Sequence, residues 1–136
     1  MTDSVKAGGC LCGAVRFTIN GSLRDVIYCH CDQCRRTSGH FVAATACSSD
    51  SLSFSEKRGI TWYASSHLAE RGFCNLCGAS LFWRTKGRDA VSIMAGSIDM
   101  PSGLVESHHI FTDSSGDYYI LQDGLPQSGQ NEQSAI

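Results

Sequence analysis

The sequence has no excess of positive charge, no long apolar run and no export signal. Its 136 residues include 11 Lys and Arg against 13 Asp and Glu, a formal net charge of −2 at pH 7. Nucleic-acid binding through a basic field is therefore not expected. No run approaches the roughly 18 apolar residues of a membrane span, and residues 1–9 lack the apolar core of a signal peptide. We expect a cytoplasmic protein that binds no membrane.

Cysteine, in contrast, is abundant, with eight residues in the chain. Seven of them fall into three tight groups: Cys10 and Cys12; Cys29, Cys31 and Cys34; and Cys74 and Cys77. In a chain without an export signal, clustered cysteines serve as metal ligands more often than as disulfides. The Cys-x-Cys spacing also suits a metal better than a short, strained disulfide. We therefore predict metal binding.

The pattern of apolar residues predicts an all-β protein, because short apolar segments alternate with turn sequences. The predicted strands are residues 15–19, 26–31, 41–47, 52–55, 60–64, 80–84, 90–94, 109–112 and 118–121. A short helical turn over residues 33–38 would end at Gly39. We predict one domain over residues 1–125, large enough to bury about two-thirds of its unfolded surface. A polar, mobile tail would follow over residues 126–136.

The first and last cysteine pairs predict a closed metal site, here called the four-cysteine group (Cys10, Cys12, Cys74 and Cys77). Each pair is followed by Gly, which lets the backbone turn tightly beside a metal. Four thiolates saturate a tetrahedral zinc ion, as in structural sites. Such a zinc would join segments about 60 residues apart. The alternative, which joins Cys74 and Cys77 to the middle group, is less favoured because five thiolates would share one ion.

The middle group, here called the three-cysteine group (Cys29, Cys31 and Cys34), predicts a second zinc. Residues two apart on an extended segment point to the same side, so Cys29 and Cys31 converge, and a turn at residues 32–33 can bring Cys34 beside them. Catalytic zinc sites keep one position open, whereas structural sites fill all four. Our main hypothesis is an open, reactive site. The alternative is a structural site completed by Cys47, His40 or His30.

The charge of an open three-thiolate site indicates its chemistry. Two positive charges on zinc against three negative thiolates leave the site anionic, which makes it a weak Lewis acid for hydrolysis. A sulfur-rich site suits a further sulfur ligand, and a thiol is deprotonated when it binds a metal. The electron-rich sulfur could then attack a small electrophile. We therefore expect formation or cleavage of a carbon–sulfur bond.

Several motifs resemble the family of glutathione-dependent formaldehyde-activating enzymes, which is grouped with centromere protein V. The similar stretches are residues 9–17 (GCLCGAVRF), 29–39 (CHCDQCRRTSG), 71–82 (RGFCNLCGASLF), 96–99 (GSID), 109–111 (HIF) and 123–126 (DGLP). Together they extend over nearly the whole chain. Three cysteine groups in this order are far more specific than a single Cys-x-x-Cys pair.

The resemblance implies a β-tent fold of small antiparallel sheets braced by two zinc ions. The four-cysteine group matches the family's structural ligands, and Cys29, Cys31 and Cys34 match the ligands of its catalytic zinc. The resemblance also implies a carbon–sulfur lyase that joins formaldehyde to the thiol of glutathione, giving S-(hydroxymethyl)glutathione. The expected partners are therefore a small thiol and a small aldehyde.

The carboxylates of an anionic thiol need cationic partners. Arg35, Arg36 and Arg71 flank the cysteine motifs and are the candidates, with solvated or structural arginines as the alternative. Asp99 and His109 are candidates to line the site. For these two, a buried turn-capping Asp and a buried, hydrogen-bonded His are the favoured alternatives.

Two other functions are compatible with a zinc-binding β protein. One is a non-catalytic, zinc-stabilised module that binds a protein partner, as the resemblance to centromere protein V makes reasonable. The other is reduction of methionine sulfoxide, which β-tent proteins with two zinc-binding Cys-x-x-Cys pairs perform through a reactive cysteine late in the chain. No cysteine follows Cys77 in this sequence, which argues against that activity.

Overall fold

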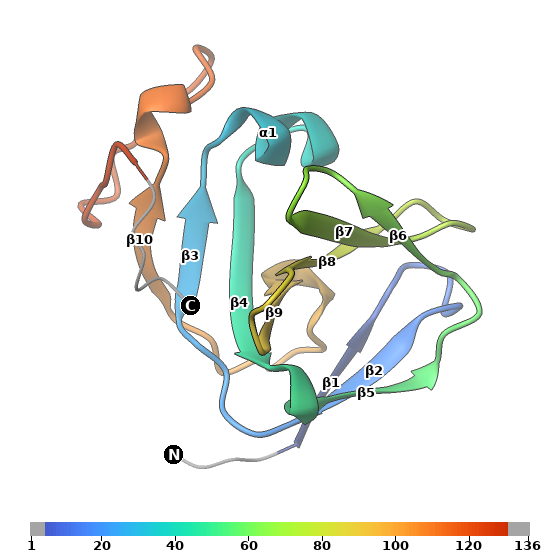
Figure 1. The fold of residues 1–136 in the computed structure, drawn as a ribbon. Helices are drawn as coiled ribbons and strands as arrows, with labels where there is room; N and C mark the ends of the chain where they lie inside the picture. Colours follow the sequence, from blue (N-terminus) through green and yellow to red (C-terminus); the bar gives the residue numbers. More distant parts are fainter. Residues whose placement is uncertain (1–4, 131–136) are drawn as a thin grey trace.

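The computed structural model describes residues 5–130, and β-strands dominate this part of the chain (Figure 1). Its ten strands form a smaller sheet of order β1-β2-β5 and a larger sheet of order β10-β3-β4-β9-β8-β7-β6. The strands are β1 (Val5–Gly9), β2 (Arg16–Asn20), β3 (Val26–Cys29), β4 (Val42–Ser48), β5 (Leu52–Glu56), β6 (Ile60–Ala64), β7 (Ala69–Cys74), β8 (Ser80–Thr85), β9 (Ala90–Met94) and β10 (Glu106–Ile110). The predicted all-β class with more than one small sheet is confirmed.

The helix α1 (Asp32–Ser38) lies across one end of β3 and β4 (Figure 1). The predicted helical turn over residues 33–38 is therefore confirmed. It ends at Gly39, which has a left-handed φ of 89° and donates its N–H to the carbonyl of Arg35 at 2.7 Å. Short 3₁₀ helices are η1 (Ser49–Ser51), η2 (Ala95–Ser97) and η3 (Thr112–Ser114). None of the helices within residues 5–130 has the length and apolar character that a membrane crossing requires.

Along the strands of the larger sheet, alternate side chains point to the core and to a cavity. Phe82 and Ile93 are buried in the core cluster, where Phe82 packs edge-to-face against Phe17 of the smaller sheet with ring centroids 5.1 Å apart. Their chain neighbours Trp83 and Ser92 line a cavity instead. Successive strand residues point to opposite faces. The core and the cavity therefore lie on opposite faces of the larger sheet.

The last predicted strand pair is wrong. Residues 118–121 form no strand, and β10 pairs instead with β3, in parallel orientation, whereas the other strand pairs described here are antiparallel. Residues 118–121 contact the rest of the protein through their side chains instead. The hydroxyl groups of Tyr118 and Tyr119 lie within hydrogen-bonding distance of rings of His40 and His30. Side-chain contacts thus hold this segment without a backbone ladder.

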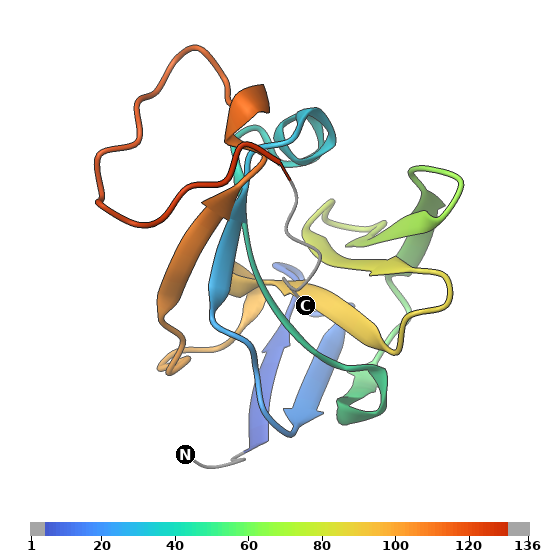
Figure 2. The same ribbon diagram turned by 60° about the vertical axis from the view of Figure 1, so that its left-hand side comes forward.

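The first residues of the predicted mobile tail pair with β10. The N–H of His109 in β10 donates to the carbonyl of Pro126 at 2.9 Å, and the N–H of Ser128 donates to the carbonyl of His109 at 2.9 Å. The backbone of residues 126–130 therefore pairs with a strand despite their polar composition, and the mobility of the tail stays a prediction. In Figure 2 the segment after β10, orange to red, loops outward and returns beside that strand. Residues 131–136, also in the predicted tail, lie outside the described residues.

Candidate metal centres and their cavity

The four-cysteine group comes together where the loops after β1 and β7 meet. Its four sulfur atoms lie within 4.8 Å of one another, and the Cys12 sulfur lies 3.8 Å from those of both Cys10 and Cys74. A tetrahedral zinc ion with Zn–S bonds of about 2.3 Å spaces its sulfurs by about 3.8 Å. The group can therefore hold a metal ion, and its donor set and spacing fit zinc.

Backbone geometry in both loops explains how the sulfurs converge. Gly13 and Gly78 have left-handed φ angles of 87° and 81°, a conformation that glycine adopts without strain. The N–H of Val15 donates to the Cys10 sulfur at 3.3 Å. Backbone hydrogen bonds, that of Ala79 first, lower the pKa of Cys77 to about 6. These N–H groups favour the thiolate form that a metal needs.

The three-cysteine group is assembled by the end of β3 and the start of α1. Cys31 is the N-cap of α1, and its sulfur accepts the N–H of Cys34 at 3.3 Å. The helical turn thus brings the buried Cys34 back beside Cys29 and Cys31, and the three sulfurs lie within 4.8 Å of one another. Within residues 5–130, no further His, Cys, Asp or Glu ligand atom joins them at that spacing.

The three thiols differ in acidity. Hydrogen bonds with the thiols of Cys29 and then Cys34 lower the pKa of Cys31 to about 2, while its partnership with the Cys31 sulfur raises the pKa of Cys29. The group therefore favours one thiolate stabilised by its neighbours. A divalent cation would displace the remaining protons, as metal binding to thiols does. This group can also hold a metal ion.

None of the three side chains considered as a fourth ligand joins this group. Cys47 is buried in the core, where desolvation raises its pKa to about 11. The His40 ring lies 2.8 Å from the hydroxyl of Tyr118. His30 does not join the group either, as the alternation argument predicts. Its ring nitrogens meet the side chains of Tyr119 and His109.

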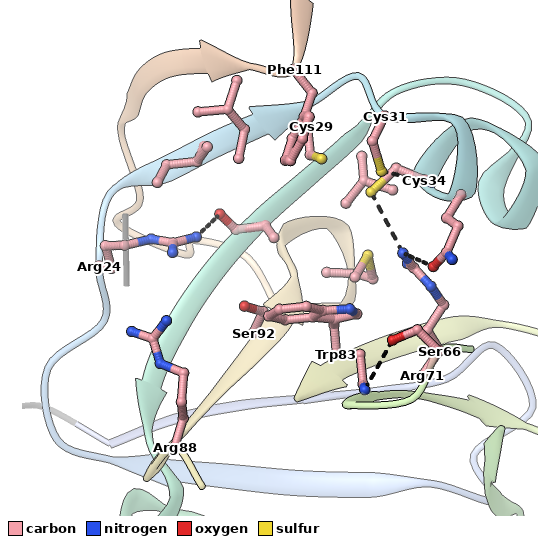
Figure 3. Close-up of a pocket in the computed structure, with 17 residues that line it drawn as sticks. Arg24, Cys29, Cys31, Cys34, Ser66, Arg71, Trp83, Arg88, Ser92 and Phe111 are labelled. Carbon is pink, nitrogen blue, oxygen red and sulfur yellow. Dashed lines mark hydrogen bonds between the residues drawn. The ribbon is translucent and has the colours of Figure 1, made fainter. Parts of the chain in front are cut away.

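The three-cysteine group lines one end of a cavity of about 270 Å³. β3, β4, β7, β8 and β9 all contribute side chains to it, and Trp83 lies across its middle (Figure 3). Its apolar wall consists of Ile27, Val42, Ala44, Ala69, Met94, Ile110 and Phe111. Small-molecule sites typically combine such apolar walls with a few polar groups. Here the polar groups are the three sulfurs, three arginines, Gln33, Ser66 and Ser92.

Arg71 of β7 lies at the sulfur end of the cavity. Its Nη2 is 3.9 Å from the Cys34 sulfur and 3.3 Å from Oε1 of Gln33 (Figure 3). Its Nε is buried without a hydrogen-bond partner among the described residues. A buried guanidinium atom in this position is a donor available to an anionic or polar ligand.

Two further arginines, Arg24 and Arg88, line the cavity on the side away from Arg71, beyond Trp83 (Figure 3). Arg24 precedes β3, and its Nη2 donates to the carbonyl of Ala44 at 2.8 Å. Burial lowers its pKa. The lining contains three arginines and, among the described residues, no carboxylate side chain, so the cavity favours an anionic ligand.

The structure separates the predicted arginines. Arg71 lines the cavity, but Arg35 and Arg36 do not: each pairs with Asp32 at 3.2 Å on α1. The adjacency of Arg35 and Arg36 to the cysteines in sequence was misleading because α1 directs Arg36 to solvent and the half-buried Arg35 toward the carbonyl of Ser114. Sequence reasoning missed Arg24 and Arg88. Arg24 stands five residues before Cys29 and Arg88 eleven residues after Cys77, both in connections between strands, and no local pattern distinguishes them.

Asp99 and His109 do not line the cavity. Asp99 is exposed, not buried in a turn as expected, and forms an ion pair with Arg16 at 2.7 Å that lowers its pKa. His109 is 1% exposed and hydrogen-bonded through both ring nitrogens. The structural alternative is therefore confirmed for His109 and wrong for Asp99, whose carboxylate pairs with Arg16 on the surface.

A two-sheet fold with two cysteine groups, one of them opening on a cationic cavity, agrees with the comparison to known families. The family model of the glutathione-dependent formaldehyde-activating enzyme matches residues 5–114. The chain belongs to this family.

Two similar proteins add to this comparison. A Schizosaccharomyces pombe protein named as an uncharacterized lyase is 35% identical over 89 residues, which cover 65% of this chain and 64% of the yeast protein. The match thus spans less than two thirds of that relative. A Rhodobacter sphaeroides protein of known crystal structure has a TM-score of 0.58 at 23% identity, covering 74% of this chain and 97% of that one. This second likeness concerns the fold alone.

Proposed function

We propose that the protein is a zinc-dependent carbon–sulfur lyase that joins a small aldehyde, such as formaldehyde, to an anionic thiol, such as glutathione. One observation carries the proposal: the three-cysteine group lines a cavity that three arginines also line. Membership of the family and the name of the yeast relative support a lyase. A cytoplasmic location, where free thiols are abundant and stay reduced, belongs to the same proposal.

The two cysteine groups would have different roles. The four-cysteine group would hold a structural zinc, and Cys29, Cys31 and Cys34 would hold a reactive one. When bound there, zinc would supply a coordination position at which an incoming thiol loses its proton. The three-cysteine group faces the cavity, whereas the four-cysteine group is absent from its lining. This difference in access is why we assign the chemistry to the first.

The arginines would bind and orient the substrate. Arg71, next to the Cys34 sulfur, would offset the negative charge that gathers at the sulfur end. Arg88 would hold a carboxylate of the thiol substrate at the other end, with its carbon chain against Trp83 and the apolar wall. Holding both ends fixes the direction in which the sulfur approaches the aldehyde.

The reaction is an addition without oxidation or reduction. A bond forms between the substrate sulfur and the carbonyl carbon while the carbon–oxygen π bond breaks. The thiol proton ends on the former carbonyl oxygen, which becomes the hydroxyl group of the product. The reverse direction cleaves the carbon–sulfur bond and returns the thiol and the aldehyde.

Exchange NMR tests the proposal with the zinc-loaded protein, glutathione and ¹³C-formaldehyde. We expect faster interconversion of free and thiol-bound formaldehyde than in the spontaneous reaction, and loss of this acceleration in Cys34→Ser. Cys47→Ser, which alters a cysteine outside both groups, is the control and should retain it. Absence of acceleration with glutathione, cysteine and mercaptoacetate alike would reject the lyase and favour a non-catalytic binding module.

A further inference from the structure

Four side chains, one of them that of His30 between Cys29 and Cys31, form a continuous hydrogen-bonded chain. The Tyr119 hydroxyl lies 2.6 Å from Nδ1 of His30, and Nε2 of His30 lies 2.8 Å from Nδ1 of His109. Nε2 of His109 lies 2.8 Å from Oδ2 of Asp123. Both histidines are almost completely buried, at 0% and 1% exposed.

The direction of these hydrogen bonds follows from the carboxylate at one end. Hydrogen bonds from the Leu125 N–H and from His109 lower the pKa of Asp123, so the carboxylate is an acceptor only. Nε2–H of His109 therefore donates to it, which leaves Nδ1 of His109 to accept from Nε2–H of His30. Nδ1 of His30 then accepts the Tyr119 O–H. All four ring nitrogens are satisfied with both rings uncharged.

This chain reaches the metal-binding backbone at one residue. His30 stands between Cys29 and Cys31, so the orientation of its ring is coupled to the peptide units that place two of the three sulfurs. The N–H of His30 also donates to the carbonyl of Ile110 at 3.1 Å. Tyr119 and Asp123 come from the segment after β10, which Figure 2 shows looping out and back. That segment is thereby connected to the three-cysteine group.

We propose that Tyr119, His109 and Asp123 are positioning residues for the metal at the three-cysteine group. They hold the His30 ring, and with it the backbone of Cys29 and Cys31, in the geometry that lets the sulfurs meet one ion. The inference rests on the proposed metal in that group. Hydrogen-bonded partners outside the ligand set typically change metal affinity 10- to 100-fold. Loss of the chain should weaken this metal and spare the one in the four-cysteine group.

Adjacent tyrosines provide a matched pair of variants. Tyr119→Phe removes the hydroxyl that meets His30, whereas Tyr118→Phe removes the hydroxyl that lies 2.8 Å from Nδ1 of His40, outside the chain. The measurement is the transfer of zinc from the intact protein to a chromogenic chelator. We expect wild type and Tyr118→Phe to release two equivalents with the same two rates. Tyr119→Phe should release one of them about tenfold faster and the other unchanged.

Two further variants and a spectrum distinguish a role in placing the metal ligands from a role in the stability of the whole fold. Asp123→Asn keeps an acceptor for His109 and should release zinc nearly as wild type does, while Asp123→Leu should resemble Tyr119→Phe. In the cobalt-substituted protein, Tyr119→Phe should alter the sulfur-to-cobalt charge-transfer bands of one site, and Tyr118→Phe should not.

Each contrary result has a defined meaning. Two equivalents released from Tyr119→Phe at wild-type rates would overturn the positioning role alone. Equal acceleration of both equivalents, with a lower melting temperature, would assign the chain to general stability and also overturn it. Wild-type protein that binds metal only at the four-cysteine group would overturn both this inference and the proposed function.

Discussion

Cys47 differs from the other seven cysteines in its surroundings. It is 6% exposed and packs in the core with Val91 and Phe82, whereas the others converge in the two metal-binding groups. Burial raises its pKa to about 11, so it remains a neutral thiol near neutral pH. The same residue type therefore has two roles, set by whether partner sulfurs are within reach.

We expect Cys47→Ala to keep full metal content and to lower the free energy of unfolding by about 1 kcal/mol, the cost of removing one buried group of methylene size. Elemental analysis and denaturant unfolding measure the two quantities. Cys34→Ser is the comparison, because it should lose metal from the three-cysteine group. Loss of one metal equivalent in Cys47→Ala would show that Cys47 is a ligand.

In the proposed reaction, the charge of Arg88 would select among thiol substrates. Arg88→Ala should raise KM about tenfold for thiols that carry a carboxylate, because a charged hydrogen bond is lost only with the anionic ligand. Turnover of those thiols, and both constants for the uncharged thiol mercaptoethanol, should stay unchanged. Exchange NMR at increasing thiol concentration gives kcat and KM. Arg36→Ala is the matched control, since Arg36 is 77% exposed on α1 and pairs with Asp32. Equal effects on charged and neutral thiols would contradict this role.

Among the elements, the stability of the short helix α1 depends on the residue that caps its C-terminus. Gly39 follows it with φ of 89°, and no atom lies within 4 Å of a Cβ built there. Gly39→Ala should therefore cost about 1 kcal/mol through backbone strain alone. Gly96 has equally open space without a left-handed φ, so Gly96→Ala should be neutral or slightly stabilising. Equal melting temperatures of the two variants would contradict the strain argument.

Strands with a clear apolar pattern could be predicted from the sequence, and two others could not. Residues 15–19, 60–64 and 90–94 correspond closely to β2, β6 and β9. The sequence of β1, VKAGG, and that of β7, AERGFC, contain glycine and charged residues, which are depleted in strands. They become strands because each has partners: β1 pairs with β2, and β7 lies between β6 and β8.

At the scale of the whole molecule, the four-cysteine group connects the two sheets, because β1 belongs to the smaller and β7 to the larger. We expect Cys77→Ser to lose a metal and to destabilise the fold by several kcal/mol, since metal binding at such a site contributes directly to folding. Cys31→Ser should lose a metal from the three-cysteine group with much less effect on melting temperature. Near-UV circular dichroism and elemental analysis distinguish these outcomes. Unfolding of both variants to the same extent would contradict the division of roles.

Each cysteine pair and the triplet could be predicted from the sequence because the spacing within each is local. The union of the two distant pairs followed from the sulfur count, since four thiolates saturate a tetrahedral zinc ion. The cavity could not be predicted from the sequence. Its arginines, Arg24, Arg71 and Arg88, come from three separate parts of the chain. Only the packing of β3, β7 and the β8–β9 connection brings them to one face. Likewise, nothing in the sequence signals that Asp123 reaches His109 across 14 residues.

The pairing of residues 126–130 with β10 has a consequence for solubility. β10 is the outermost strand of the larger sheet, and an uncovered outer strand offers free N–H and carbonyl groups to another molecule. The carbonyl of Pro126 and the N–H of Ser128 occupy those groups on His109. A chain shortened after Leu125 should consequently self-associate as its concentration rises, measured by light scattering, while one shortened after Gln130 should behave as the full chain. Residues 126–130 would then prevent aggregation through β10.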